Sequence, residues 1–425
     1  MAKLRDSVRH FGLLAVTGVM LAAVPAAAKK PVVSGGPVIE MSESFRAAAK
    51  AADAAIKVDD VATAQAQIGG LVPVSDFEAY TAAALRFELA VQRGDRQAQR
   101  VALTDMFKTS SVPKKDAPRL RYVAGYLSYV VGNNDDALAQ LDYAKTLGYD
   151  SIEATMLRAD IALRRNKPRD ARPYIQEALA RQKASGKAVP AAWYDRAISL
   201  AYGSGDWAEV GSLYRERLAR YDSAADWRSA LANYLAAPGI DSQLQLDLYR
   251  LQAANGAMAS ERDYQGYAQL AEKAGNFAEA KAIIEAGRAA GKLTATQATT
   301  AALMKSVSPK AAKQIAAVPA AAKKAANAKD GSAALAVGDS YFSLSQFPQA
   351  AEQYRLALAK GGVDQGKANA RLGIALARSG DLAGAKAALA QVSGNWANVA
   401  GFWSVWVDQQ SRKTAFKPVG VTPAS

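Results

Sequence analysis

Two copies of one short pattern lie 35 residues apart between Ser332 and Gly394. The first copy reads Val337-Gly338-x-x-Tyr341, then Ala350-x-x-x-Tyr354 and Ala357; the second reads Leu372-Gly373-x-x-Leu376, then Ala385-x-x-x-Leu389. The small residues in both copies let two antiparallel helices approach closely, and the larger residues fill the groove between neighbouring pairs. The stretch therefore predicts stacked helix–turn–helix units.

This pattern resembles the tetratricopeptide repeat, in which an apolar-Gly-x-x-aromatic first helix precedes an Ala-x-x-x-aromatic second helix. Extended backwards in steps of about 35 residues, the register meets Gly or helix-capping residues in the turns, as at Gly205-Asp206, Gly275-Asn276 and Gly380-Asp381. The resemblance implies an all-α fold, a right-handed α-α superhelix (solenoid) of about ten TPR-like helix-turn-helix units with a C-terminal capping helix. The second helix of each unit is expected to carry a small or apolar residue at Ala64, Ala98, Ala137, Ala171, Val210, Leu244, Ala280, Ile315, Ala350 and Ala385.

The repeat register also divides the chain. We expect a flexible leader at 29–43 and the solenoid at 44–391, with its clearest repeats at 119–150, 262–290, 332–360 and 367–391. The Ala- and Lys-rich stretch 301–331 is interpreted as a degenerate repeat with its turn at Ser308-Pro309, and a local kink or a mobile segment is the alternative, because Pro319 falls inside its second helix. A capping helix is expected at 395–410, where five large apolar residues share one helical face, and a disordered tail at 411–425.

Residues 1–28 have the pattern of a secretory signal peptide: three basic residues, an apolar run from Phe11 to Val24, and Ala26-x-Ala28 as a cleavage site. The apolar run is shorter than the ~20 residues of a membrane-spanning helix, which disfavours an uncleaved anchor. The prediction is a periplasmic protein, with secretion as the alternative. No membrane span is expected after cleavage.

Composition excludes several kinds of chemistry. The chain has no Cys, and its one His, His10, would leave with the signal peptide. The mature chain would therefore lack thiol nucleophiles, His-based proton relays and the usual zinc or copper ligands. We expect no cofactor, no metal and no enzyme activity. A hydrolase that uses carboxylates alone stays open as a weaker alternative.

The resemblance also implies a concave surface, lined by the first helix of each unit, where peptides bind. Tyr122, Tyr126 and Tyr129 share one helical face on this side, with Arg119 one turn earlier. Tyrosines are frequent anchors at interfaces, although a stripe of this kind also packs against neighbouring helices. Further polar residues are expected on the same surface: Arg262, Gln265, Gln269 and Lys273, and then Asp195, Ser199, Tyr202 and Asn233.

The mature chain keeps 50 Lys and Arg against 38 Asp and Glu, a net charge of +12. The basic residues are interpreted as pairs spread over the sequence, such as Lys323-Lys324, which does not favour nucleic acid. The first hypothesis is a non-catalytic periplasmic scaffold that binds a protein or peptide in its groove, in cell-envelope assembly. The alternative is an accessory protein of peptidoglycan or exopolysaccharide processing or export that contacts an anionic glycan or wall polymer.

Overall fold

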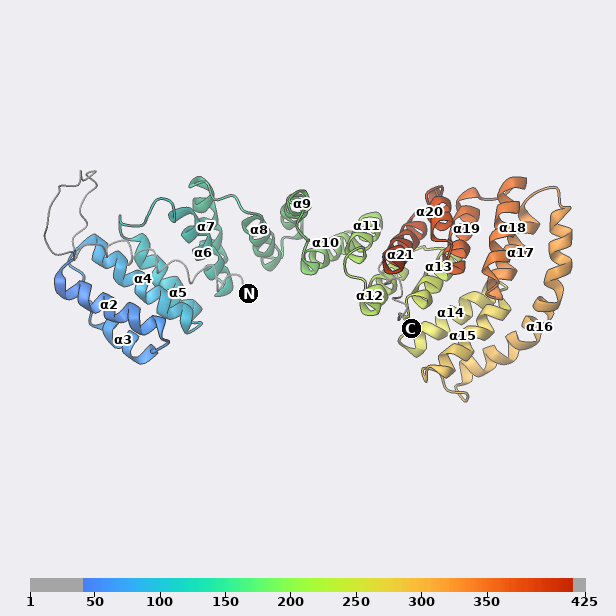
Figure 1. The fold of residues 1–425 in the computed structure, drawn as a ribbon, viewed down its shortest axis with the longest axis horizontal. Coiled ribbons are helices and arrows are strands. Elements are labelled where there is room, and N and C mark those ends of the chain that lie inside the picture. Colours follow the sequence, from blue (N-terminus) through green and yellow to red (C-terminus); the bar gives the residue numbers. More distant parts are fainter. Residues whose placement is uncertain (1–40, 416–425) are drawn as a thin grey trace, which may run out of the picture. The chain divides into compact units, whose positions relative to one another are not determined.

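The computed structural model describes residues 41–415, and within that range the regular elements are helices, with no strand. The chain divides into two compact units, 1–189 and 190–425. Figure 1 shows the helices of both units under the labels used below. The prediction of an all-α array of helical pairs is confirmed, whereas the handedness of the superhelix stays a prediction.

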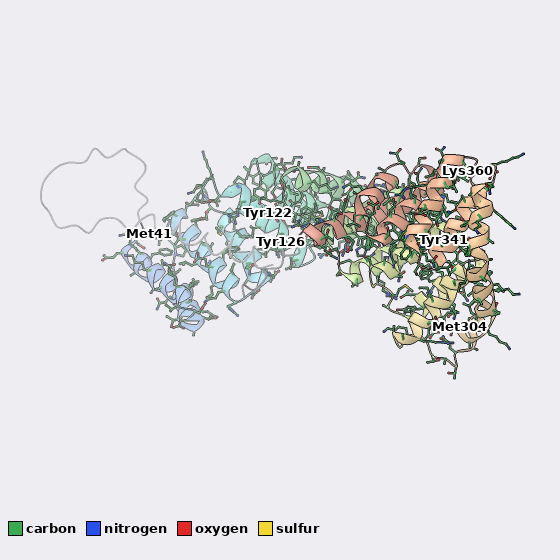
Figure 2. All side chains as sticks on the ribbon, turned by 45° about the vertical axis from the view of Figure 1, so that its right-hand side comes forward. Met41, Tyr122, Tyr126, Met304, Tyr341 and Lys360 are labelled. Atoms are coloured by element: carbon green, nitrogen blue, oxygen red, sulfur yellow. The ribbon has the colours of Figure 1, made fainter. Side chains whose placement is uncertain are left out.

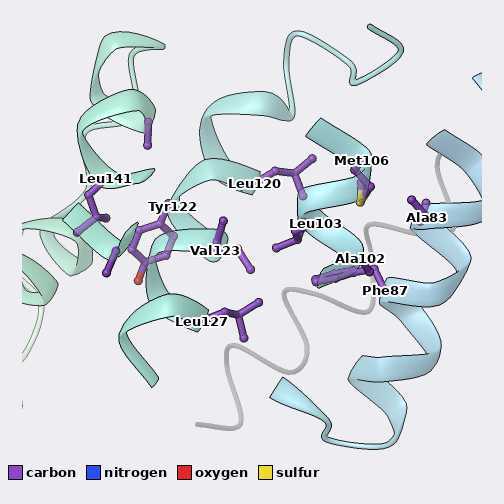
Figure 3. Packing of buried hydrophobic residues seen from close by; sticks show 14 of the residues in the cluster. Ala83, Phe87, Ala102, Leu103, Met106, Leu120, Tyr122, Val123, Leu127 and Leu141 are labelled. Atoms are coloured by element: carbon purple, nitrogen blue, oxygen red, sulfur yellow. The ribbon is translucent and has the colours of Figure 1, made fainter. Parts of the chain in front are cut away.

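Unit 1 has eight described helices, which form four consecutive pairs with short turns inside each pair. Its core is made of the faces that the pairs turn toward one another, and Figure 3 shows part of it around α4 to α7. The helices are α2 (Glu43–Lys57), α3 (Val61–Gly69), α4 (Asp76–Gln92), α5 (Arg96–Phe107), α6 (Ala117–Val130), α7 (Asn134–Thr146), α8 (Ile152–Arg164) and α9 (Pro168–Ala184).

Unit 2 contains five further pairs, one long unpaired helix and a C-terminal helix. The pairs are α10 (Ala191–Gly203) with α11 (Trp207–Leu218), α12 (Ala224–Leu235) with α13 (Ser242–Ala254), α14 (Glu261–Lys273) with α15 (Phe277–Ala289), α17 (Ser332–Ser343) with α18 (Phe347–Lys360), and α19 (Gln365–Ser379) with α20 (Leu382–Leu389). The long helix is α16 (Ala298–Ala326), and the short 3-10 turn η1 (Gly394–Trp396) leads into α21 (Ala397–Ala415).

Two of the three turns that the sequence singles out have both the glycine and the helix cap that it predicts, whereas in the third Gly275 has φ of +77° but Asn276 makes no side-chain cap hydrogen bond. Gly205 and Gly380 have φ of +72° and +91°, in the left-handed region that ends a helix and that glycine enters without strain. The following aspartates cap the next helix: Asp206 Oδ1 accepts from Glu209 N at 3.0 Å, and Asp381 Oδ1 accepts from Gly384 N at 2.8 Å.

The close approach within pairs depends on glycine and alanine. A Cβ on Gly338 would lie 2.5 Å from Tyr354 Cε1, and one on Gly373 would lie 2.6 Å from Leu389 Cγ, so neither site has room for a side chain. Seven of the ten expected second-helix positions are 0 % exposed: Ala64, Ala137, Ala171, Val210, Ala280, Ala350 and Ala385. The small residues therefore recur with the repeat because each lies where the two helices of a pair pack closely.

The structure corrects the prediction of a helix–turn–helix repeat at 301–331. Instead of two helices with a turn at Ser308-Pro309, α16 runs unbroken through Pro309 and Pro319, and Ile315 is 53 % exposed. A turn needs a residue that ends the helix, yet no described residue between Gly291 and Ser345 has a positive φ. Both prolines are on the exposed side, where water can solvate the carbonyls that they leave without a partner, and the many alanines favour helix.

The C-terminal helix differs from the prediction in length and in role. It extends to Ala415, so the first five residues of the expected tail are helical. It contacts α20, as a cap would, but also α11, α13 and α19. Trp403 and Phe402 are fully buried, and Trp403 Nε1 donates to Asp247 O at 3.1 Å. The helix therefore joins the two ends of unit 2 instead of covering one edge.

The start of the described chain also differs from the prediction. Met41 is buried in the core of unit 1 and α2 begins at Glu43, both inside the range expected for the leader. Glu78, on α4, accepts hydrogen bonds from Ser42 N and Ser42 Oγ at 2.7 and 2.8 Å and holds this end of the chain. The expected signal peptide, most of the leader and residues 416–425 lie outside the described residues.

Candidate functional site

A cavity of about 340 Å³ opens between α10, α11 and α12 of unit 2. Asp195, Ser199 and Tyr202 reach it from α10, because their spacing puts them on one helical face. Asn233 reaches it from α12. These four residues were all expected on the concave surface, and the structure brings them together. The remaining lining residues are Ile198, Tyr214, Arg217, Asp226 and Ser229.

Arg217, on α11, is the central charge of the cavity. Its Nε donates to Asp195 Oδ1 at 2.8 Å and its Nη1 donates to Asp226 Oδ1 at 2.7 Å. Burial acts to lower the pKa of Arg217, but the two carboxylates outweigh burial and raise it. Burial acts to raise the pKa of Asp226, and hydrogen bonds from Ser223 and Arg217 outweigh it and lower that pKa. Arg217 and Asp226 therefore stay charged at neutral pH.

The other end of the cavity is aromatic. Tyr202 is 48 % exposed, and its ring meets Trp207 edge-on with the centroids 4.9 Å apart. Asn233 Nδ2 donates to Tyr214 OH at 2.7 Å, which fixes both side chains. Burial raises the pKa of Tyr214, so its hydroxyl stays protonated. A rigid aromatic surface beside fixed donors and acceptors is suited to bind a polar chain segment.

The sequence did not single out Tyr214, Arg217, Asp226 or Ser229. Tyr214 and Arg217 come from the second helix of a pair, whereas the expected concave surface was drawn from first helices alone. One local signal was available for Asp226, because Ser223-x-x-Asp226 is the spacing of a capping box, and both of its hydrogen bonds are present. The contact between Asp226 and Arg217 is visible only in three dimensions.

A second hollow in unit 2, of about 630 Å³, lies between α21 and the turn after α11. Three of its charged residues, Asp222, Arg412 and Lys413, already have partners within the unit. Arg412 donates to Ala219 O at 3.2 Å, and Lys413 Nζ lies 3.9 Å from Asp222 Oδ2. Gln409 at its base donates to Leu218 O at 2.8 Å. These contacts fasten α21 to unit 2, so we assign this hollow to the structure of the unit.

The tyrosine stripe of unit 1 lies on α6 and divides into two parts; Figure 2 labels two of its members, Tyr122 and Tyr126. Tyr122 is 8 % exposed and stacks on Tyr149 with centroids 5.0 Å apart, and Figure 3 shows it among the buried side chains. Burial raises its pKa. The structure therefore places Tyr122 in the core, which is the packing alternative that the sequence left open for this stripe.

The other stripe residues are less enclosed. Tyr126 and Tyr129 are half-buried, and the Arg164 guanidinium lies 3.6 Å from the ring centroid of Tyr129. Arg119, at the start of the same helix, is also half-buried. Tyr126 and Tyr129 thus keep part of their rings accessible. On α14 of unit 2, Arg262 and Gln269 are exposed and Gln265 is half-buried, and none of the three lines either cavity.

No family model and no curated protein matches the chain. Among solved structures, a tetratricopeptide repeat protein from Parabacteroides merdae is similar over 70 % of this chain and 99 % of that one, at 14 % identity and a TM-score of 0.35. The quorum sensor NprR of B. thuringiensis is similar over 75 % of this chain and 99 % of its own, at 14 % identity and a TM-score of 0.32. The TPR2AB-domain:pHSP90 complex of yeast Sti1 is similar over 71 % of this chain and 99 % of its own, at 15 % identity and a TM-score of 0.25.

The chain is similar to tetratricopeptide-repeat proteins. At this identity the similarity concerns the fold alone, and the description of the helical pairs rests on the structure of this chain. Within 41–415, no helix is long and apolar enough to cross a membrane. The same residues contain no group of three potential metal ligands.

Proposed function

We propose that the chain is a non-catalytic scaffold of the bacterial periplasm that binds a protein or peptide partner during cell-envelope assembly. The observation that carries the proposal is the cavity on α10, α11 and α12. It combines an exposed tyrosine with carboxylate, amide and hydroxyl groups that are held by hydrogen bonds within the unit. Such a preformed polar surface binds an extended segment with little loss of conformational entropy.

A second observation favours the cavity on α10 to α12 as the place where the partner binds: the space between the other helices of unit 2 near Asp247 is already filled. In the region around Asp247 and Trp227, α21 occupies the space between the helices: Trp403 donates to Asp247 O, and Trp227 Nε1 donates to Gln409 Oε1 at 3.1 Å. A partner segment could bind there only by displacing α21. The cavity on α10 to α12 needs no such displacement, so we place the partner there. Tyr126 and Tyr129 of unit 1 are proposed as a separate contact.

The scaffold role is favoured over catalysis by the charge state of Arg217 and Asp226, which line the cavity. Asp226 is held ionised by Ser223 and Arg217, and Arg217 is held charged by two carboxylates. A general acid or base needs a pKa near the working pH, and neither residue is tuned in that direction. Their arrangement instead supplies fixed hydrogen-bond donors and acceptors.

The experiment is site-specific photocrosslinking in the envelope of living cells. A photoreactive phenylalanine analogue replaces Tyr202 in the full chain, and a second version carries it at Tyr143, which is exposed on α7 of unit 1. We expect one discrete protein adduct from position 202 and none from position 143. Adducts of equal strength from both positions, or adducts to wall polymer alone, would overturn the proposal.

A matched pair of substitutions locates the contact. Ser229→Trp fills the cavity, whereas Ala232→Trp adds the same ring to an exposed position of α12 outside the lining. We expect Ser229→Trp to remove the adduct and Ala232→Trp to leave it. Because both positions are exposed, both variants should keep the helical signal of the parent chain. The periplasmic location is tested separately, by sequencing the N-terminus of the protein released by osmotic shock.

A further inference from the structure

We propose that the solvent face of α16 binds a linear phosphate-bearing polyanion. This site lies outside the α10–α12 cavity and does not depend on a protein partner there. From Ala286 to Lys329 the sequence has eight basic residues and no Asp or Glu. The excess positive charge is therefore concentrated in one stretch, which corrects the interpretation of pairs spread over the sequence.

The structure arranges part of this charge on one face. Positions 305, 313, 323 and 324 of α16 fall within about 100° on a helical projection. The buried residues of the helix, among them Val307, Ala311 and Val318, lie on the opposite side against α15 and α17. The four lysines thus follow one another along the solvent side of α16, over about 28 Å of helix. We call Lys305, Lys313, Lys323 and Lys324 the lysine row.

The ammonium groups of the row have no carboxylate partner among the described residues. The nearby Glu272 is already engaged, because it accepts from Ser306 Oγ at 3.0 Å and lies 3.7 Å from Lys310 Nζ. Lys323 and Lys324 are in the last turn of α16, where a positive charge also complements the helix dipole. All four side chains are exposed, so binding an anion requires no change in the fold.

The solvent face of α16 is open because this helix has no paired helix to cover it. Elsewhere in unit 2 a second helix covers most first helices, but α16 is a single helix between α15 and α17, and Figure 1 places it along one edge of the unit. Its outward residues between the lysines are Ala and Pro, which are small. An extended polymer can therefore lie along the row without steric obstruction.

The composition of the face favours a polymer over a membrane. An interfacial helix buries large apolar or aromatic residues in the lipid. The only large apolar residue exposed on α16 is Ile315, and it projects about 80° or more away from the lysine row. The four residues of the lysine row bind phosphate as point charges, whereas the buried carboxylate pairs of unit 2 use arginine, as in Arg250 with Glu279.

The test is a titration of end-labelled linear polyphosphate with the full chain, followed by fluorescence anisotropy over a range of salt concentrations. The variant replaces the lysine row by glutamine: K305Q, K313Q, K323Q and K324Q together. We expect at least a tenfold loss of affinity at low salt. We also expect the slope of log K against log salt to become shallower by about 2 to 3, because each lost phosphate contact contributes about 0.7.

Two controls separate the site from general charge and from misfolding. The set K114Q, K115Q, K145Q and K187Q removes the same charge from exposed positions of unit 1, and we expect less than a twofold loss. Arginine at the four positions of the row keeps the charge and should keep the affinity within about threefold. Equal losses in both glutamine sets, or no loss in the row variant, would overturn the proposal.

Two further probes distinguish the source of the anion. Poly-glutamate of equal charge and vesicles rich in acidic phospholipid are titrated in the same way. Weaker binding of both than of polyphosphate supports the proposal. Tighter binding of poly-glutamate would assign the row to an acidic protein segment. Binding of vesicles that Ile315→Ser abolishes would assign it to a membrane surface, and either result overturns the polymer assignment.

Discussion

At the scale of single residues, the repeat depends on positions that have no room for a methyl group. Gly338→Ala would place its Cβ 2.5 Å from the buried ring of Tyr354, whose hydroxyl is held by Asp339 Oδ1 at 2.8 Å. Because this ring cannot move without breaking that hydrogen bond, we expect a loss of about 1 to 3 kcal/mol of unfolding free energy. Denaturant unfolding followed by tryptophan fluorescence measures it.

Gly203→Ala is the matched control for that substitution. It lies at the end of α10, and a Cβ there would have no heavy atom within 4 Å. Alanine reduces the freedom of the unfolded chain and meets no obstacle, so we expect no loss, or a gain of up to about 1 kcal/mol. Equal destabilisation by the two alanines would show that close approach is not the reason for glycine at position 338.

Glu88 makes the stability of unit 1 depend on pH. Burial, together with the charge of Asp53 on α2, raises its pKa to about 7, and Lys57 opposes the shift. The folded state therefore favours the protonated acid, so its stabilisation is full below pH about 4.5 and is lost as pH rises through about 7. Glu88→Gln should remove this loss and make unit 1 more stable than the parent at pH 8.

Hydrogen exchange of the α2 and α4 amides measures this effect, because unit 1 contains no tryptophan. In the parent chain we expect the free energy of opening, corrected for intrinsic exchange, to fall between pH 5 and pH 8. The Glu88→Gln chain should show a smaller fall. A steeper fall in the variant would contradict the assignment of the pH dependence to this carboxyl.

At the scale of elements, unit 2 is joined by a buried charge network. Arg250 on α13 donates to both oxygens of Glu279 on α15, at 2.8 and 2.7 Å, and to Asp247 Oδ1 at 2.6 Å. Arg371 on α19 pairs with Asp339 and lies 3.9 Å from Asp247 Oδ2. Burial raises the pKa of Asp247, although the two arginines oppose the shift. The network therefore connects α13 to α15 and also to α19, whose Arg371 follows Asp247 by more than 100 residues in the sequence.

Arg250→Ala would leave Glu279 and Asp247 buried without their main cation. We expect a loss of about 3 to 5 kcal/mol, because removing one partner of a buried ion pair leaves an uncompensated charge. The control is Lys281→Ala, which removes an exposed pair with Glu285 on α15 and should change stability by less than about 1 kcal/mol. Similar losses for both would mean that the buried network does not hold unit 2 together.

The elements also show what the sequence could and could not predict. Turns and close approaches were predictable because Gly, Asp and Ala act locally, as Gly380-Asp381 and Gly338 show. The continuity of α16 could have been read from the absence of glycine between 298 and 326, but two prolines concealed it. That α21 is a helix was predictable from the apolar face of its sequence. Its partners were not, because Trp227 and Asp247 lie over 150 residues away and carry no periodic signal.

The candidate site shows the same limit. Asp195, Ser199, Tyr202 and Asn233 were placed on one surface by the repeat register alone, and they do line one cavity. The register could not predict that Arg217 would bridge Asp195 and Asp226, because side chains of three helices meet there. It put Tyr122 on the concave side, but it could not decide between binding and packing, and the ring of Tyr149, 27 positions later, stacks on Tyr122 and buries it. Helical register gives the direction of a side chain, whereas burial depends on the neighbouring pair.

At the scale of the whole molecule, each of the two units has its own core, and all six tryptophans belong to residues 190–425. Fluorescence therefore reports the unfolding of unit 2 alone, whereas circular dichroism reports the helices of both. We expect two thermal transitions in circular dichroism, of which fluorescence detects only one. Arg250→Ala should lower the transition seen by fluorescence by about 10 °C, from a loss of 3 to 5 kcal/mol in a unit of this size. It should leave the other transition in place. A single transition with the same midpoint by both methods, shifted as a whole by Arg250→Ala, would show that the two units unfold as one cooperative body.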